Sequence, residues 1–216
     1  MKYKYIIWDF NGTVIDDVEI GIKSVNPLLR ARGLKTIDSL AEYQSAFTFP
    51  IKEYYKNLGF DFDAEPYEKI AHEWVANYEA HVSEIGLVDG VRELICLFDA
   101  AGCEQMILSA SESGMLERQL KGFGLENKFS KILSLDNIYA HSKVDIAREY
   151  FETVSDRSAY LMIGDTEHDA EVASAVGIDA VLVACGHMSR ERLEKTGFPV
   201  YDDMNGLKQD ILLKMV

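Results

Sequence analysis

An acidic side chain follows a short apolar segment near the start of the chain, and other polar groups follow later apolar segments. The first group is Asp9, at the end of IIWD, and the last are Asp165 and Asp169 in GDTEHD. Between them lie Ser109 in ILSAS and Lys143 in HSKVD. A carboxylate nucleophile, donors for anionic oxygens and a pair of metal-binding acids are the groups that phosphoryl transfer needs. The sequence therefore predicts a phosphoryl-transfer site.

The acids of this set suit a magnesium ion. Mg²⁺ prefers oxygen ligands and keeps several waters, so one or two carboxylates and a few further oxygens are enough. We expect its ligands to be Asp9, the backbone carbonyl of Asn11, and Asp165 or Asp169. Asp9 is also expected to be the nucleophile that attacks phosphorus.

The expected substrate contacts lie in two loops and at one lysine. Ser109 and Lys143 are expected to hold the phosphoryl oxygens, and Lys143 also to offset repulsion between the carboxylates. Ser111 competes with Ser109 for this assignment. The remaining expected substrate-binding residues are Gly12, Thr13 and Ala110.

These residues can meet only if the chain forms a parallel sheet, because the carboxyl ends of parallel strands share one edge and bind ligands there. Strands and helices alternate at a spacing that predicts a doubly wound α/β fold. The expected strands are Tyr5–Trp8, Gln105–Leu108, Lys131–Leu135, Tyr160–Ile163 and Ala180–Val183. The expected helices between them are Gly90–Ala101, Gly114–Phe123, Val144–Thr153 and Ala170–Val176.

The stretch between the first two strands is too long for a simple crossover. It carries helix-like patterns, and we expect residues 16–86 to form a helical cap domain over Asp9, inserted into a core domain of residues 1–15 and 87–216. A cap of this kind excludes water from a reaction. The expected cap helices are Ile20–Arg32, Ser39–Phe47, Ile51–Leu58 and Pro66–Ser83.

The motif D-x-N-G-T from Asp9 to Thr13 resembles the nucleophile motif D-x-D-G-T of phosphatases in the haloacid dehalogenase (HAD) superfamily. The later serine, lysine and GDxxxD resemble that family's remaining motifs in the same order, and the resemblance covers about residues 1–15 and 87–210. It implies a Rossmann-like core and catalytic roles for Asp9, position 11, Ser109 and Lys143. The tail ACGHMSRERLEKTGFPVYDDMNGL is similar to that of phosphoglycolate-phosphatase-like members.

Asn11 departs from this family pattern, in which the second acid protonates the leaving group and then activates water. An amide cannot exchange that proton, and losing general acid–base help costs about 10²–10⁴ in rate. The resemblance implies a phosphatase of a small phosphorylated metabolite that is slowed at this step. The alternative is a catalytically impaired HAD scaffold that binds phosphate esters in a regulatory role.

The amide at position 11 also bears on which reaction of the family the chain performs. A phosphomutase is disfavoured because it needs the acid that Asn11 replaces. A dehalogenase is disfavoured because it does not use the metal that Asp165 and Asp169 are expected to bind. A phosphonate-cleaving enzyme would need a cap lysine, for which Lys52 and Lys56 are the candidates. Two origins of the amide stay open, a deliberate Asp→Asn replacement that traps a complex and a native Asn11-Gly12 step that deamidates.

Composition limits the partners. A net charge of −14 argues against nucleic acid and anionic membrane surfaces. The apolar run before Asp9 is too short for a typical signal peptide, and no stretch is long enough to span a bilayer. The three cysteines do not have the spacing of a metal site. We expect a cytoplasmic protein, a monomer or a homodimer.

Several residues near these motifs are assigned plainer roles. His168 is expected to face outward or to support the ligands from behind, and His141 and His187 have no spacing typical of zinc. Arg30 and Arg32 are expected to be surface charges, with the alternative that one of them meets an anionic tail of the substrate. The aromatic residues expected in the interior of the cap are Phe47, Phe49, Tyr54 and Tyr55.

Overall fold

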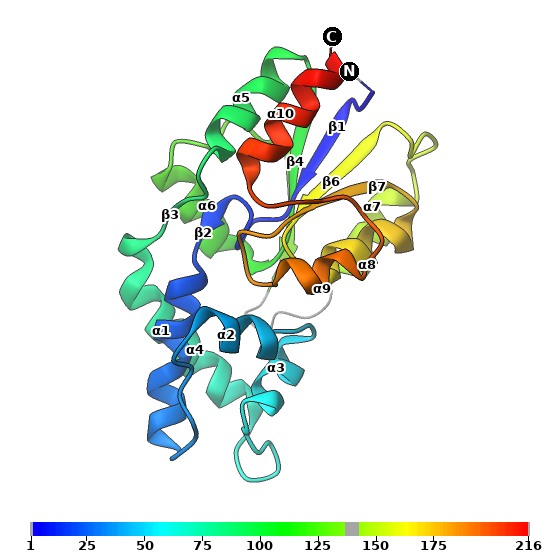
Figure 1. Cartoon of the computed structure of the whole chain (residues 1–216). Helices are drawn as coiled ribbons and strands as arrows, with labels where there is room; N and C mark the ends of the chain where they lie inside the picture. Colours follow the sequence, from blue (N-terminus) through cyan, green and yellow to red (C-terminus); the bar gives the residue numbers. More distant parts are fainter. Residues whose placement is uncertain (1, 137–142, 216) are drawn as a thin grey trace.

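A computed structural model describes residues 2–136 and 143–215, so His141 lies outside the described residues. Its centre is a parallel sheet with strand order β5-β4-β1-β6-β7-β8 (Figure 1). The predicted doubly wound α/β fold is confirmed. The strands are β1 (Tyr5–Trp8), β4 (Glu104–Glu112), β5 (Lys131–Leu135), β6 (Tyr160–Gly164), β7 (Asp179–Val183) and β8 (Val200–Tyr201).

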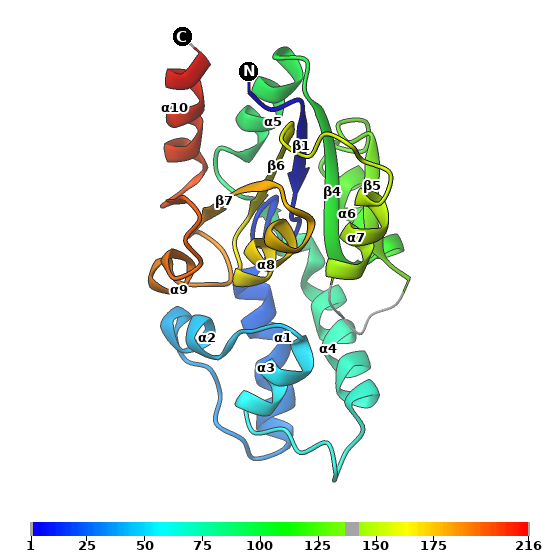
Figure 2. The ribbon, with the colours of Figure 1, turned by 90° about the vertical axis from the view of Figure 1, so that its right-hand side faces the viewer.

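Helices cover both faces of this sheet because the strands are apolar on both sides. On β1, Ile6 and Trp8 pack with one helical layer and Ile7 with the other. The first layer contains α5 (Val91–Ala100), α6 (Ser113–Gly122) and α10 (Met204–Met215), and the second contains α7 (Val144–Phe151) and α8 (Glu167–Val176) (Figure 2).

A helical segment lies beyond the carboxyl edge of the sheet (Figure 1). The chain reaches it through β2 (Ile15–Asp16) and returns through β3 (Gly86–Leu87), and these two short strands pair antiparallel. We call residues 18–84 the helical insert; the division of the chain into two domains stays a prediction. The insert consists of α1 (Val18–Ala31), α2 (Leu40–Ala46), α3 (Ile51–Asn57), α4 (Tyr67–His81) and the 3₁₀ turn η1 (Val82–Glu84).

Local sequence explains where several helices begin. Ser39 accepts a hydrogen bond from the Glu42 amide at the start of α2. Thr166 and Asp169 form a capping box at the start of α8, which satisfies amides that the helix itself leaves unpaired. None of the helices in the described part of the chain is long and apolar enough to cross a membrane.

The structure differs from the sequence predictions at three places. Strand β4 continues through Glu112, so Ser109 lies within it instead of after it, and the pairing with β5 shifts register after Leu108. The pair β2 and β3 is too short to give a strand pattern. In the tail, β8, α10 and α9 (Arg190–Glu194) were not predicted.

Candidate active site

A buried lysine joins two of the predicted acids at the carboxyl edge of the sheet. Asp9 directly follows β1, and its Oδ1 lies 2.6 Å from Lys143 Nζ. The same Nζ lies 2.6 Å from Asp169 Oδ1. Burial by itself lowers the pKa of Lys143, but the carboxylates of Asp169 and Asp9 outweigh it and the pKa is raised. Lys143 therefore stays charged.

Asp165, directly after β6, is held by two other segments. Its Oδ1 accepts a hydrogen bond from Thr13 Oγ1 at 2.8 Å, and its Oδ2 accepts one from the His187 amide at 2.6 Å. Gly12 has a φ of 73°, and a Cβ at this position would collide with Asp165 and His187. The glycine of D-x-N-G-T is therefore needed both for its backbone conformation and for its lack of a side chain.

Three carboxylates come together at this edge. Asp9, Asp165 and Asp169 each offer an oxygen within 4.8 Å of the others, and all three are buried. Burial, reinforced by Asp169, raises the pKa of Asp9 well above its ordinary value, and burial also raises the pKa of Asp165. One lysine cannot neutralise three ionised acids, and the donor set consists of oxygens. The residues present therefore fit a divalent cation such as Mg²⁺.

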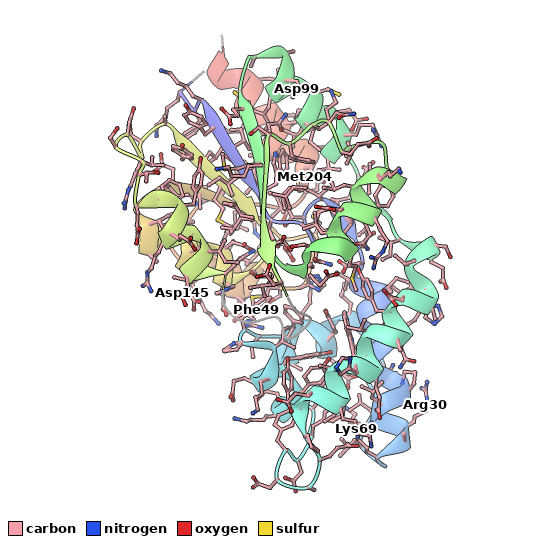
Figure 3. All side chains as sticks on the ribbon, turned by 180° about the vertical axis from the view of Figure 1, so that it is seen from behind. Arg30, Phe49, Lys69, Asp99, Asp145 and Met204 are labelled. Atoms are coloured by element: carbon pink, nitrogen blue, oxygen red, sulfur yellow. The ribbon has the colours of Figure 1, made fainter. Side chains whose placement is uncertain are left out.

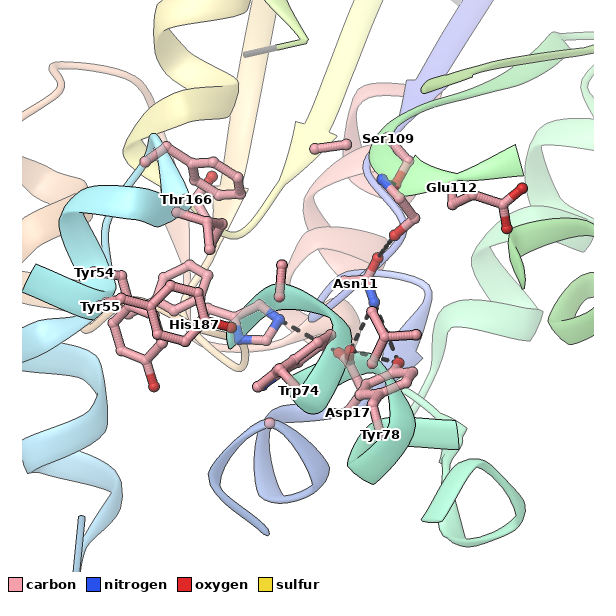
Figure 4. A pocket seen from close by; sticks show the side chains of 18 of the residues that line it. Asn11, Asp17, Tyr54, Tyr55, Trp74, Tyr78, Ser109, Glu112, Thr166 and His187 are labelled. Carbon is pink, nitrogen blue, oxygen red and sulfur yellow. Dashed lines mark hydrogen bonds and ion pairs between the residues drawn. The ribbon is translucent and has the colours of Figure 1, made fainter. Parts of the chain in front are cut away.

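The side chain of Asn11 is fixed at both of its polar ends. Its Nδ2 donates to Asp17 Oδ2 at 2.6 Å, and its Oδ1 accepts from Ser111 Oγ at 2.6 Å (Figure 4). The adjoining Gly12 amide donates to Asp17 Oδ1 at 2.9 Å. Cyclisation at Asn-Gly needs a free carboxamide and a free glycine nitrogen, so this geometry opposes deamidation of Asn11.

Asp17 and His187 form a second buried charge pair beside Asn11. His187 Nε2 lies 3.3 Å from Asp17 Oδ1, and its Nδ1 is 2.8 Å from the Tyr43 hydroxyl. Burial works against the charge of the imidazolium, but Asp17 and then Asp165 outweigh it and raise the pKa of His187 to about 9. Burial likewise works against the Asp17 carboxylate, but His187 outweighs it, so its pKa is lowered. The pair is ionised at neutral pH.

The chain matches the family model for the haloacid dehalogenase-like hydrolases over residues 6–183. It belongs to this family. Among its relatives, the tyrosine-protein kinase PtkA of Mycobacterium tuberculosis is 27% identical over 203 residues, which cover 90% of this chain and 67% of PtkA. A phosphoglycolate phosphatase of Mesorhizobium japonicum is 23% identical over 224 residues, which cover 100% of this chain and 98% of the relative.

A solved structure supports the fold in the same way. A haloacid dehalogenase-like hydrolase from Streptococcus pneumoniae superposes with a TM-score of 0.81, covering 100% of this chain and 99% of its own, at 16% identity. The predicted family, with its phosphoglycolate phosphatase relatives, is confirmed. The prediction of an enzyme is confirmed as a HAD-like hydrolase.

In this hydrolase a pocket lies between the charged edge and the helical insert. Asp9, Asn11, Ser109, Ala110 and Lys143 line it, so the structure brings five of the predicted site residues to one cavity. Ser109 is buried, and its Oγ accepts from the Ser111 amide at 3.1 Å. The insert supplies eight aromatic side chains to the wall: Tyr43, Phe47, Phe49, Tyr54, Tyr55, Tyr67, Trp74 and Tyr78.

Two predicted substrate-binding residues lie behind this wall. Gly12 and Thr13 do not line the pocket; they contact Asp17 and Asp165. Asp165 and Asp169 are fully buried beneath it. The roles of the predicted site residues therefore stay predictions, but their positions form one cluster.

The structure shows where the residues with other expected roles lie. His168 does not face outward; it is buried, stacks on Phe49 and accepts from the Lys143 amide at 3.2 Å, which agrees with the alternative of a supporting position behind the site. Arg32 is not a free surface charge, because it pairs with two glutamates of the insert. Arg30 is exposed at the end of α1, as predicted, and lies far from Phe49 (Figure 3). The four aromatic residues assigned to the cap interior also line the pocket: Phe47, Phe49, Tyr54 and Tyr55.

Sequence reasoning missed three residues that surround Asn11. They are Asp17, Tyr78, which donates to Asp17 Oδ2 at 2.9 Å, and His187. The rule that found Asp165 would also have found His187, which comes four residues after the end of β7. Nothing in the sequence marks Tyr78, which reaches the site from the last turn of α4.

Proposed function

We propose that the chain is a Mg²⁺-dependent phosphatase of a small phosphorylated metabolite, acting through an aspartyl-phosphate on Asp9. The observation that carries this proposal is the joining of Asp9 and Asp169 by Lys143 Nζ at 2.6 Å, where Asp9 and Lys143 line the pocket below the helical insert. The phosphatases among the relatives support the reaction class. Sequence identities this low do not allow the substrates named for the relatives to be assigned to this chain.

Asp9 is positioned to attack an incoming phosphoryl group. Lys143 holds Oδ1, and no hydrogen bond to Oδ2 is found among the described residues, which leaves that oxygen for the attack. A bond forms between Oδ2 and phosphorus, the bond to the leaving oxygen breaks, and the leaving group departs with the electron pair. Lys143 then neutralises charge on the phosphoryl oxygens, and Ser109 supplies a hydroxyl beside them.

The second half of the reaction is attack of water on the aspartyl-phosphate. It returns the Asp9 carboxylate and releases inorganic phosphate. Asn11 cannot take the proton of this water or give one to the leaving group, and it is further tied to Asp17 and Ser111. We therefore propose slow turnover of alkyl phosphates, which need that proton most, and faster turnover of esters with good leaving groups.

The metal would be held by Asp9, the Asn11 carbonyl and Asp165. When bound, Mg²⁺ supplies positive charge that keeps Asp9 ionised and screens the phosphoryl oxygens. Asp169 would act from behind, because its Oδ1 pairs with Lys143 and its Oδ2 accepts from Thr166 Oγ1.

A second candidate function is the binding of phosphate esters without turnover, in a regulatory role. The fixed side chain of Asn11 favours it, because an amide with both ends bonded takes no part in proton transfer. The charge pairs at the sheet edge serve either function, so only turnover separates the two.

The deciding experiment measures phosphate release with Mg²⁺ from acetyl phosphate, nitrophenyl phosphate and 2-phosphoglycolate. The wild type is compared with Asn11→Asp, with the exchange variant Asn11→Asp/Asp17→Asn, and with Asp9→Ala as blank. Asn11→Asp alone places two carboxylates against each other, which raises one pKa strongly. The exchange keeps one amide and one acid in contact.

Turnover by the wild type that is absent from Asp9→Ala supports the phosphatase. We expect the exchange variant to gain more on 2-phosphoglycolate than the single variant gains. A silent wild type with an active exchange variant would mean that the natural function is binding.

A further inference from the structure

We propose that the substrate of this site is an aryl phosphate, a phosphate ester of an aromatic hydroxyl whose ring occupies the pocket of the helical insert. This inference rests on the proposed phosphatase function and specifies its substrate class. It combines two separate features of the molecule, the wall of the pocket and the residue at position 11.

The wall that faces the sheet edge is aromatic. Trp74 stacks on Tyr78 with ring centroids 4.9 Å apart, and Phe47 lies 5.3 Å from the ring of Tyr54 and 4.7 Å from that of His187. Such surfaces favour an aromatic ligand, which stacks on one ring and meets others edge to face.

Charge in the pocket excludes a second anionic group on the ligand. No Lys, Arg, Asp or Glu of residues 18–84 lines the pocket. Among the described lining residues, the cationic side chains Lys143 and His187 are committed to buried carboxylates. Asp17 and Glu112 add negative charge to the lining. A carboxylate on the substrate, as in 2-phosphoglycolate, would meet repulsion and, among the described lining residues, no free cation.

The chemistry at position 11 leads to the same class. When Asp9 attacks phosphorus, the bond to the leaving oxygen breaks and that oxygen keeps the electron pair. An aryl oxide stabilises this charge in its ring and takes its proton from water afterwards, whereas an alkyl oxide needs a proton during the step. Asn11 cannot supply one. A site without the acid therefore suits an aryl ester.

The first measurement separates recognition of the ring from leaving-group chemistry. Phenylphosphonate, methylphosphonate and phosphonoacetate cannot be hydrolysed at the C–P bond, and they are compared as inhibitors of acetyl phosphate hydrolysis in the presence of Mg²⁺. We expect phenylphosphonate to bind at least tenfold more tightly than the other two. Equal or tighter inhibition by phosphonoacetate would overturn the aryl proposal while leaving the phosphatase intact.

Failure of the proposed function has a different signature. If the wild type releases no phosphate from acetyl phosphate or nitrophenyl phosphate, the phosphatase proposal fails. Calorimetric titration with phenylphosphonate and phosphonoacetate in Mg²⁺ then still decides whether the pocket prefers a ring.

Two variants locate the preference. Trp74→Ala removes a half-buried ring of the wall, and we expect it to abolish most of the difference between phenylphosphonate and methylphosphonate. Phe62→Ala is the matched control, because Phe62 belongs to the insert but does not line the pocket. Equal losses in both variants would contradict the proposal. Tyr54→Phe keeps the ring and should retain the preference for phenylphosphonate.

The source of the aryl phosphate is resolved by two further substrates. Naphthyl phosphate represents a free small molecule, and a blocked phosphotyrosyl peptide represents a protein side chain. Higher kcat/KM for naphthyl phosphate assigns a metabolite, and higher kcat/KM for the peptide assigns a protein substrate. Preference for 2-phosphoglycolate over both would overturn the proposal.

Discussion

The carboxyl edge of the sheet and the facing wall of the helical insert differ in almost every physical property. At the edge, charges are buried in pairs and triads, and each carboxylate is held by donors from other segments of the chain. The wall contributes rings and aliphatic groups and no charged side chain. In the proposed function, the edge performs the phosphoryl transfer and the wall selects the substrate.

This difference has an energetic reason. A buried charge is tolerated only when its partners are fixed, so the edge cannot adapt to a new ligand without a large penalty. Aromatic and aliphatic contacts are weaker individually and less directional. A change at the edge should therefore affect catalysis or folding strongly, and a change at the wall should affect mainly affinity.

The largest effect is expected at Asp9. Asp9→Asn keeps the shape of the side chain but removes the nucleophile, and we expect kcat for nitrophenyl phosphate to fall about 10⁴-fold or more. Binding of phenylphosphonate to the wall should change far less, which titration calorimetry measures. Residual activity above about a hundredth of the wild type would show that the edge does not act through Asp9.

Lys143 comes next, in its effect on stability. Lys143→Met leaves Asp9 and Asp169 buried without their cation, and we expect the free energy of unfolding in urea, without divalent metal, to fall by about 3–5 kcal/mol. Lys128→Met is the matched control, since Lys128 pairs with Asp99 at the surface and its loss should cost less than about 1 kcal/mol. Similar losses in both variants would remove the contrast between the edge and the surface.

His187 links the edge to the insert and gives a pH dependence. Its pKa is about 9 when folded and 6.5 ordinarily, so the charged form is favoured by folding. Its contribution, about 3 kcal/mol, is complete below about pH 6.5 and is lost as the pH rises through about 9.

This pH dependence can be isolated with a variant. We expect the difference in the free energy of unfolding between wild type and His187→Gln to shrink by that amount from about pH 6 to about pH 10. His81→Gln serves as a control, because His81 lies in an exposed pair with Glu84. A difference that stays constant with pH would show that the Asp17–His187 pair does not favour the charged imidazole.

The smallest effect is expected at Arg192, which connects α9 to the insert. Its Nη1 donates to the carbonyls of Gln44 and Phe47, and its Nη2 pairs with Glu167. A lysine cannot make these contacts together, so Arg192→Lys should lower the free energy of unfolding by about 1–2 kcal/mol and raise KM more than it lowers kcat. Arg190 lies in an exposed cluster, so Arg190→Lys should leave the free energy of unfolding and the kinetic constants unchanged.

The edge of the sheet could be predicted from the sequence because its rules are local. Each predicted strand is a short apolar run, and Asp9 and Asp165 follow such runs directly. The position of Lys143 between Asp9 and Asp169 could be inferred only from the order of the motifs, since its distance from Asp9 is 134 residues along the chain.

The wall and the network around Asn11 could not be predicted in the same way. Tyr78 and Trp74 carry the apolar pattern of any packed helix, and the pattern does not say which ring faces a cavity. The sequence around Asp17 indicates only an acidic residue that precedes a helix. Its contact with Asn11 depends on the turn at Gly12, which brings residues six positions apart within 2.6 Å.

The pairing of Ile15–Asp16 with Gly86–Leu87 has a consequence for how such proteins can be altered. The two ends of the intervening helices are neighbours, separated by the width of one strand pair, so the sheet is connected to them at a single point. Any polypeptide whose own ends lie as close together can be grafted there with little loop-closure cost and no change in strand order. The helical insert, and the substrate selectivity proposed for it, can thus be replaced as a unit while the reacting groups at the sheet edge keep their positions.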